Sequence, residues 1–311
     1  MRRAAIDIGS HSFLLTIVDE WGDVVWDERH VVALGKDVGN DGSLRADRMT
    51  RGMNVLRTFL KTCEAHNVGG SAIHACATSA VRRARNGEEW VSDVLGELGL
   101  SISIATGAEE ASLTFVGSLH GLPAFDGETW AIDIGGGSAE IARGRPGCLS
   151  YAVSTPLGAA RQAELHLPAV DDAGRVSADG MNSLEANAAI ALEALTATPQ
   201  TTLGPTRCVA VGGTATSLLA LHLGHRRYRG ASLHGGILST QAIGGMVQRL
   251  LPLNRAERIA CIPFAPDRAD TLLAGAAILT AIVRTLGHAE VIISTRGLRF
   301  GMLVGAKDLD H

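Results

Sequence analysis

Residues that could hold a phosphate group occur twice in this chain of 311 residues, each time in almost the same order. The first copy is Ala5-Ile6-Asp7-Ile8-Gly9-Ser10, and the second is Ala131-Ile132-Asp133-Ile134-Gly135-Gly136-Gly137-Ser138. Each copy is an apolar run with one aspartate that ends in glycine and serine, a pattern typical of a buried strand followed by a tight turn. Glycine N–H groups and a serine hydroxyl can surround an anion, and the aspartate can hold a divalent cation. The repeat therefore predicts phosphate chemistry between two facing turns.

One copy alone would carry little weight, because Asp-Ile-Gly-Ser is common at ordinary junctions between a strand and a turn. Two matched copies carry more, since three successive glycines at 135–137 lose backbone entropy unless a particular conformation needs them. A third glycine turn, Gly212-Gly213-Thr214, follows the strand expected at 207–211. A shared binding site therefore explains these turns better than three unrelated junctions without a function.

The elements that must position these turns follow the same order in both halves of the chain. In the first half, the sequence pattern predicts strands at 4–8, 13–18, 24–34, 72–77 and 101–105, and helices around 49–63, 88–98 and from 109. In the second half, it predicts strands at 129–134, 139–143, 149–153, 207–211 and 291–294, and helices from 156, 177, 212 and 272. The segment 121–127 is the expected link. This order indicates a duplicated α/β unit with its ligand in the cleft between the halves.

Composition and charge narrow the class of protein. With 46% apolar residues, the chain is long enough for two cored domains. The apolar run at 272–283 is too short to cross a bilayer and no secretory signal is visible, so we expect a cytoplasmic protein. The five cysteines are scattered and form no Cys-x-x-Cys pair, which argues against a disulfide framework and a structural zinc site. A net charge of −4 gives no general attraction for nucleic acid or membranes.

Short motifs from end to end of the chain carry a resemblance to a known family. Beyond the two repeated turns, they are Ala77-Thr78-Ser79-Ala80-Val81-Arg82, Thr106-Gly107-Ala108-Glu109-Glu110-Ala111, Pro156-Leu157-Gly158, Asp267-Arg268-Ala269-Asp270 and Arg296-Gly297-Leu298-Arg299. With these motifs, the chain resembles the exopolyphosphatase and guanosine pentaphosphate phosphatase family (Ppx/GppA), within the actin-like ATPase superfamily. The resemblance implies two ribonuclease H-like α/β domains, with mixed sheets flanked by helices and the active site in the cleft between them. The domains would span 1–121 and 127–311, with the last helix able to pack back on the first.

The resemblance also implies roles for individual residues. Glu110 would be the base that activates the attacking water, and Arg82 would steady the terminal phosphate. Asp133 and Glu140, together with Asp7, would hold a divalent cation, which is Mg²⁺ or alternatively Ca²⁺ or Mn²⁺. The residues that would line the phosphate site are Gly9, Ser10, His11, Ser12, Gly135, Gly136, Gly137, Ser138, Gly212, Gly213 and Thr214. Without the resemblance, Glu110 is better explained as a carboxylate that interacts with a helix dipole.

Two positions depart from the pattern of the family. His11 stands where the first turn usually has asparagine, and Thr295 stands where an acidic residue commonly precedes Arg-Gly-Leu-Arg. An imidazole beside a bound phosphate is expected to gain charge as the pH falls through about 6 to 7. The two departures therefore affect the expected contacts with the substrate and leave the expected fold unchanged.

The expected function is that of a metal-dependent phosphohydrolase that releases terminal phosphate from short-chain inorganic polyphosphate, from guanosine pentaphosphate, or from both. Two alternatives stay open: a regulatory protein that binds guanosine tetraphosphate or polyphosphate without turnover, and a small-molecule kinase of the same superfamily. The expected partners are these phosphate compounds, with no nucleic acid and no membrane, and a homodimer is left open. The basic loop 225–229 is either ordinary surface or a contact for the tail of the substrate.

Overall fold

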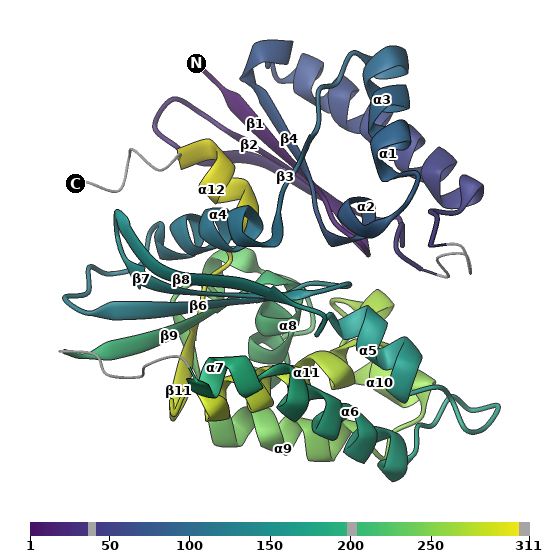
Figure 1. The fold of residues 1–311 in the computed structure, drawn as a ribbon, viewed down its shortest axis with the longest axis vertical. Coiled ribbons are helices and arrows are strands. Elements are labelled where there is room, and N and C mark those ends of the chain that lie inside the picture. Colours follow the sequence, from purple (N-terminus) through teal and green to yellow (C-terminus); the bar gives the residue numbers. More distant parts are fainter. Residues whose placement is uncertain (37–41, 198–203, 305–311) are drawn as a thin grey trace.

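The computed structural model describes residues 1–36, 42–197 and 204–304 of the chain. It contains two sheets, one in the upper and one in the lower half of Figure 1, each with helices packed against it. Among the described residues, no helix combines the length and the apolar character needed to cross a membrane. The structure confirms the α/β class and the two mixed sheets flanked by helices.

The first sheet has the strand order β3-β2-β1-β4-β5. Its strands are β1 (Arg3–Ile8), β2 (Ser12–Val18), β3 (Val24–Val31), β4 (Ile73–Ala77) and β5 (Ser103–Ile104). The helices of this half are α1 (Ala46–Ala65), α2 (Ser79–Arg83) and α3 (Gly87–Leu98). Strand β1 is antiparallel to β2 and parallel to β4, and the apolar side chains of β1, β2 and α1 form the core.

The second sheet has the strand order β10-β11-β9-β6-β7-β8. Its strands are β6 (Glu128–Ile134), β7 (Ala139–Arg145), β8 (Cys148–Thr155), β9 (Thr206–Val211), β10 (Gly236–Ser239) and β11 (Glu290–Ile293). The helices of this half are α5 (Ala159–His166), α6 (Ala178–Ala191), α7 (Glu193–Ala197), α8 (Gly212–His222), α9 (Thr240–Leu250), α10 (Arg255–Cys261) and α11 (Leu272–Thr285). Strand β6 is antiparallel to β7 and parallel to β9, so the sequence repeat corresponds to a repeated pairing of strands.

Two helices lie between the sheets: α4 (Gly107–Leu119) and α12 (Leu298–Val304). Helix α4 packs against β6, β7 and β8, and α12 packs against α4 and β1. The two helices cross at glycines, because a Cβ atom on Gly117 would lie 1.9 Å from the Gly297 carbonyl oxygen and one on Gly301 would lie 1.9 Å from that of Leu113. The expected boundary between domains at 121–127 stays a prediction.

The predicted elements differ from the structure in a few places. The strand expected at 24–34 ends at Val31, and Ala33 has a positive φ of 53° that an extended strand does not allow. The strand expected at 101–105 is shorter, at Ser103–Ile104. The sequence pattern missed α2, α7, β10, α9, α10 and α12.

Candidate functional site

The two repeated turns and the third glycine turn meet at one cavity of about 120 Å³. All eleven predicted phosphate-binding residues line it: Gly9, Ser10, His11, Ser12, Gly135, Gly136, Gly137, Ser138, Gly212, Gly213 and Thr214. The turns touch, because a Cβ atom on Gly136 would lie 2.9 Å from Cβ of His11, and one on Gly137 would lie 2.6 Å from Oγ of Ser10. The glycines are therefore required for the close approach of the two halves.

The third turn needs glycine for its conformation. Gly212 has a φ of +81°, and a Cβ atom there would lie 2.3 Å from Oδ1 of Asp133. Gly212 also begins α8, so the backbone passes directly from β9 into the helix beside the Asp133 carboxylate. This geometry brings the end of β9 against the end of β6 with no space for a side chain.

Four carboxylates line the same cavity: Asp7 from β1, Glu110 from α4, Asp133 from β6 and Glu140 from β7. Asp133 and Glu140 are opposite each other in the antiparallel pair of β6 and β7. Burial, followed by the nearby charge of Glu110, raises the pKa of Asp7 to about 8 and that of Asp133 to about 7. The same two causes raise the pKa of Glu140 well above its usual range. The cavity thus brings together four acidic side chains whose charged forms burial disfavours.

The chemistry of these donors fits a hard divalent cation. The three predicted ligands, Asp7, Asp133 and Glu140, share the cavity. Within the described ranges, however, no three His, Cys, Asp or Glu side chains form a group that could hold a metal ion by themselves. Mg²⁺ is commonly held by one or two carboxylates together with waters and substrate phosphates, so a smaller protein ligand set suffices for it.

Glu110 lies in the first turn of α4, which begins with a capping box formed by Thr106 and Glu109. Only 7% of Glu110 is exposed, and its Oε2 atom accepts a hydrogen bond of 2.8 Å from Nη1 of Arg82. Burial raises the pKa of Glu110, and the hydrogen bond and charge of Arg82 oppose this shift. Nη1 of Arg82 also donates to the carbonyl of Ala105 at 2.8 Å. Arg82 therefore fixes the Glu110 side chain by a hydrogen bond, and Arg82 is not among the described residues that line the cavity.

Arg268 is a cavity residue to which the sequence analysis gave no role. It packs closely against the third turn, because a Cβ atom on Gly213 would lie 1.7 Å from its Nη2 atom. Burial and the charge of Arg29 lower the pKa of Arg268 to about 10, so the guanidinium group remains charged at neutral pH. The motif Asp267-Arg268-Ala269-Asp270 was the only signal for this position. Thr78 and Thr271 also line the cavity.

His11 has a lowered pKa in the free protein. Burial, followed by the charge of Arg268, lowers the pKa of His11 to about 4. Its Nε2 atom is buried and has no hydrogen-bond partner among the described residues. His11 is therefore neutral between about pH 6 and 7 in the free protein, and the expected gain of charge beside a bound phosphate stays a prediction.

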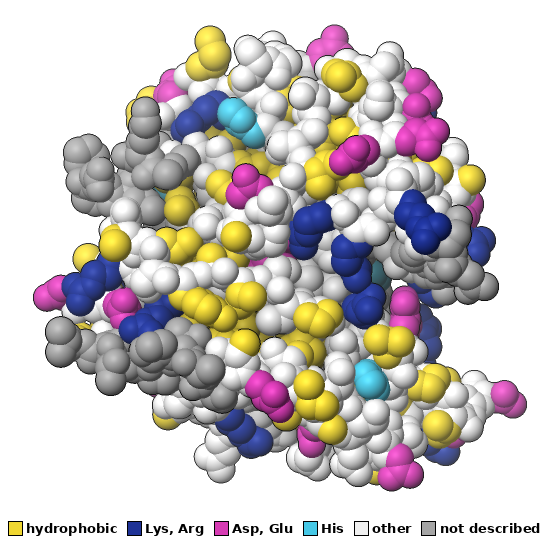
Figure 2. All heavy atoms as spheres, in the orientation of Figure 1, with side chains coloured by type: hydrophobic (Ala, Val, Ile, Leu, Met, Phe, Trp, Pro, Cys, Tyr) yellow, Lys and Arg dark blue, Asp and Glu magenta, His cyan; other side chains and the backbone are white. Residues whose placement is uncertain are grey.

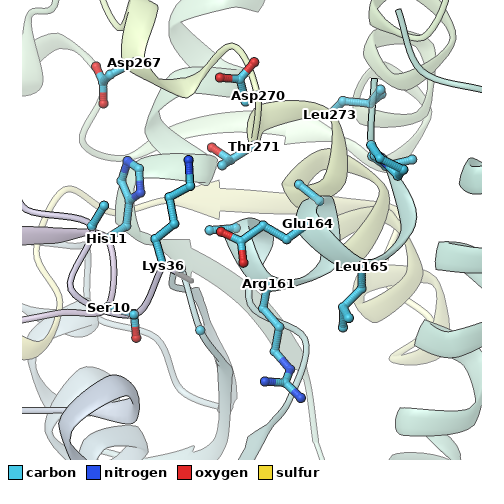
Figure 3. Close-up of a pocket in the computed structure, with 18 of the residues that line it drawn as sticks. Ser10, His11, Lys36, Arg161, Glu164, Leu165, Asp267, Asp270, Thr271 and Leu273 are labelled. Carbon is cyan, nitrogen blue, oxygen red and sulfur yellow. The ribbon is translucent and has the colours of Figure 1, made fainter. Parts of the chain in front are cut away.

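A second, larger cavity of about 790 Å³ continues outward from the first. The two cavities share the residues Ser10, His11, Gly136, Gly137, Ala160 and Thr271. Figure 3 shows the Glu164 side chain of α5 pointing toward the side of this outer cavity where His11 and Lys36 of the first half lie, while the Arg161 side chain extends toward the lower edge of the view. Figure 2 shows Lys and Arg side chains gathered along the boundary between the two halves. The basic loop 225–229 lines neither cavity.

Known proteins resemble this chain over nearly its whole length. The model of the Ppx/GppA phosphatase family matches residues 16–309. Exopolyphosphatase 2 of Mycobacterium tuberculosis is 29% identical over 304 residues, which cover 92% of this chain and 91% of that protein. The guanosine-5'-triphosphate,3'-diphosphate pyrophosphatase of Aeromonas hydrophila is 28% identical over 314 residues, which cover 99% of this chain and 60% of that protein.

Solved structures agree with these matches. A Ppx/GppA family member from Aquifex aeolicus superposes with a TM-score of 0.80 at 28% identity, over 98% of this chain and 96% of its own. An exopolyphosphatase from Cytophaga hutchinsonii superposes with a TM-score of 0.86 at 24% identity, over 97% of this chain and 96% of its own, which supports the fold alone. These findings confirm the expected fold class and the expected class of enzyme, a hydrolase that acts on phosphoanhydride bonds. The chain belongs to the Ppx/GppA phosphatase family.

Proposed function

We propose that this protein is a divalent-cation-dependent phosphohydrolase that releases the terminal phosphate of short-chain inorganic polyphosphate, of guanosine pentaphosphate, or of both, with Glu110 as the base. The observation that carries the proposal is the position of Glu110. Glu110 lines the cavity formed by the two repeated turns, and Arg82, which does not line it, donates a hydrogen bond to the Glu110 carboxylate. A carboxylate so placed can take the proton of a water that attacks a phosphoryl group bound at the turns.

The remaining groups of the inner cavity support transfer of a phosphoryl group. The terminal phosphate would lie against the N–H groups of the glycine turns and the hydroxyl of Ser10. Arg268 supplies a guanidinium group at the cavity wall that can neutralise charge as the bond to the leaving oxygen breaks. The released proton would pass to Glu110, whose pKa burial raises toward the range that suits a general base.

Ppx/GppA phosphatases generally use divalent cations, and the carboxylates of this cavity suit one. Asp133 and Glu140, with Asp7, are the side chains that would hold it. A bound cation would supply positive charge that polarises the phosphoryl oxygens. Burial disfavours the charged forms of Asp7 and Asp133. The positive charge of a bound cation would lower the pKa values of both carboxyl groups and so favour their ionised forms.

The sizes of the two cavities favour attack at a chain end. The inner cavity of about 120 Å³ has room for one phosphoryl group, and the outer cavity of about 790 Å³ leaves space for the rest of the substrate. The names of the relatives point to two such substrates, inorganic polyphosphate and a guanosine phosphate. A terminal group would thus occupy the smaller cavity, and the remaining phosphates or a nucleoside would lie in the larger one.

The test is phosphate release from tripolyphosphate, longer polyphosphate, guanosine pentaphosphate and ATP, each with magnesium and with a chelator. We expect release from polyphosphate or guanosine pentaphosphate in magnesium and little in chelator. Substrate binding without any release would favour the regulatory protein instead. Transfer of phosphate from ATP to a sugar or another acceptor would favour the kinase.

A further inference from the structure

Arg83 places a guanidinium group where the inner and outer cavities join. It is the last residue of α2, and its Nε atom donates to the carbonyl of Ser79 at 3.1 Å, which fixes the direction of the side chain. A Cβ atom on Gly137 would lie 3.2 Å from Nη2 of Arg83, so the guanidinium group lies beside the glycine turn of the other half. Arg83 is exposed and lines the outer cavity.

Arg161 belongs to the opposite wall of the same cavity. Its backbone N–H donates to the carbonyl of Gly136 at 3.0 Å, and that of Ala159 donates to the carbonyl of Gly135 at 2.8 Å. These bonds attach the first turn of α5 to the second glycine turn. The Arg161 side chain is exposed and lines the outer cavity.

Neither arginine has an acidic partner within 4.0 Å among the described residues. Two of the acids that line the outer cavity are already paired, Asp267 with Arg29 and Asp270 with Arg255. The third, Glu164, lies three residues after Arg161 on α5. Partial desolvation and then the positive charge of Arg161 lower the pKa of Arg83, so the two like charges are near enough to oppose each other. An anion between them would remove that repulsion.

We propose that Arg83 and Arg161 together hold the second phosphate of a linear phosphate chain, the group next to the terminal phosphate in the inner cavity. This inference rests on the proposed function, since it assumes that the terminal group lies at the glycine turns. Arginine suits the task because its planar guanidinium group can bind two phosphate oxygens at once. The two residues come from different halves of the molecule, so the second phosphate joins the halves.

The experiment compares Arg83→Gln and Arg161→Gln with Arg57→Gln, which removes the same charge from α1, where Arg57 forms an exposed ion pair with Glu97 of α3. Calorimetry measures binding of tripolyphosphate and of orthophosphate, both with magnesium. We expect each cavity variant to weaken tripolyphosphate binding by about 10- to 100-fold. Orthophosphate has no second phosphate, so its binding should stay close to that of the wild type. Arg57→Gln should change neither.

The double variant and the stability of the free protein add two readouts. If one phosphate touches both arginines, the loss in the double variant should be smaller than the product of the two single losses. Because the like charges oppose each other, Arg83→Gln should melt at the same temperature as the wild type or above it. A lower melting temperature, with equal losses for both ligands, would show a structural role and overturn the inference.

The inference and the proposed function fail in different ways. A wild-type protein that binds tripolyphosphate but releases no phosphate would contradict the proposed hydrolysis, and the comparison of ligands would still decide the role of the arginines. Losses no larger than those of Arg57→Gln, or a wild-type protein that does not bind tripolyphosphate, would overturn the second-phosphate site. Fully multiplicative losses in the double variant would show that the arginines do not share one phosphate.

Discussion

At the scale of single residues, the site is defined by ionisable groups that burial has moved away from their usual pKa values. Asp7 and Asp133 are acids with raised pKa values, and His11 is a base with a lowered one. In each case desolvation is the largest cause, and it favours the neutral form. The cavity therefore holds less net charge than its residue types suggest. Arg268 is the exception, because its pKa of about 10 leaves it charged at neutral pH.

The substitution His11→Asn tests the protonation state of the histidine. With a pKa of about 4, His11 is neutral in the free enzyme at every pH above about 5, so it should not shape kcat/KM between pH 6 and 8. Since kcat/KM reports the pKa values of the free enzyme, we expect the wild type and the variant to share the same apparent pKa values. The measurement is the pH profile of phosphate release at low substrate. An inflection between pH 6 and 7 that only the wild type shows would contradict this account.

At the scale of elements, the crossing of α4 and α12 positions the proposed base. Glu110 is in the first turn of α4, and Gly117 and Gly301 allow α12 to pack directly on this helix. Helix α12 is tied in turn to the first sheet, where Nη1 of Arg3 donates to the carbonyl of Leu303 at 2.6 Å. The position of the carboxylate thus depends on contacts made more than a turn away from it.

Gly301→Ala should displace α4 and reduce turnover. The new Cβ atom would lie 1.9 Å from the Leu113 carbonyl oxygen, so one helix must shift. A displacement of about 1 Å at the base can cost about 100-fold in rate, and we expect kcat to fall by about 10- to 100-fold. Gly96→Ala in α3 is the control: nothing lies within 4 Å of its Cβ position, and a gain of about 0.4–1 kcal/mol in the free energy of unfolding is expected. Normal kcat in a folded Gly301→Ala protein would show that the crossing does not position Glu110.

The elements that the sequence predicted well are those whose signals are local. The strands that carry Asp7 and Asp133 could be found because an apolar run, an aspartate and glycines occur together. The helix α12 was missed because it is a short element held by distant partners, β1 and α4. Arg268 was missed as a cavity residue for the same reason, since nothing near it in the sequence shows that it will lie on Gly213.

At the scale of the whole molecule, the site exists only when the two halves are together. The four cavity carboxylates come from both sheets and from α4 between them. On the outer side, Arg29 of β3 makes two hydrogen bonds of 2.8 and 2.9 Å with Asp267 of the second half. The sequence repeat predicted the facing turns, but it could not predict that Arg82 would hold Glu110 instead of lining the cavity.

The raised pKa values of the cavity acids make the stability of the folded protein depend on pH. The folded protein binds more protons than the unfolded chain between the ordinary pKa of Asp7, 3.8, and its folded value of about 8. The free energy of unfolding should therefore fall as the pH rises across this range in the absence of cation. Asp7→Asn removes this contribution, so it should raise the melting temperature at pH 8 by several degrees, at about 2–4 °C for each kcal/mol.

Thermal melts of the two proteins at pH 5 and pH 8 in chelator make this comparison. Asp47→Asn is the control, because Asp47 is an exposed acid whose pKa a hydrogen bond from Arg45 lowers. That variant should not gain stability at pH 8. An Asp7→Asn protein that melts below the wild type at pH 8 would contradict the assigned burial of Asp7.

The central claim is that Glu110 activates the attacking water, and the most direct measurement is turnover and substrate binding of Glu110→Gln. Glutamine keeps the size of the side chain but cannot accept the proton. A positioned general base contributes about 100- to 10,000-fold, so kcat should fall by about that factor. Calorimetry should show that the variant still binds tripolyphosphate, because the glycine turns and Arg268 are unchanged. Near-normal turnover would contradict the role of Glu110 as the base, and loss of binding together with turnover would make this glutamate structural.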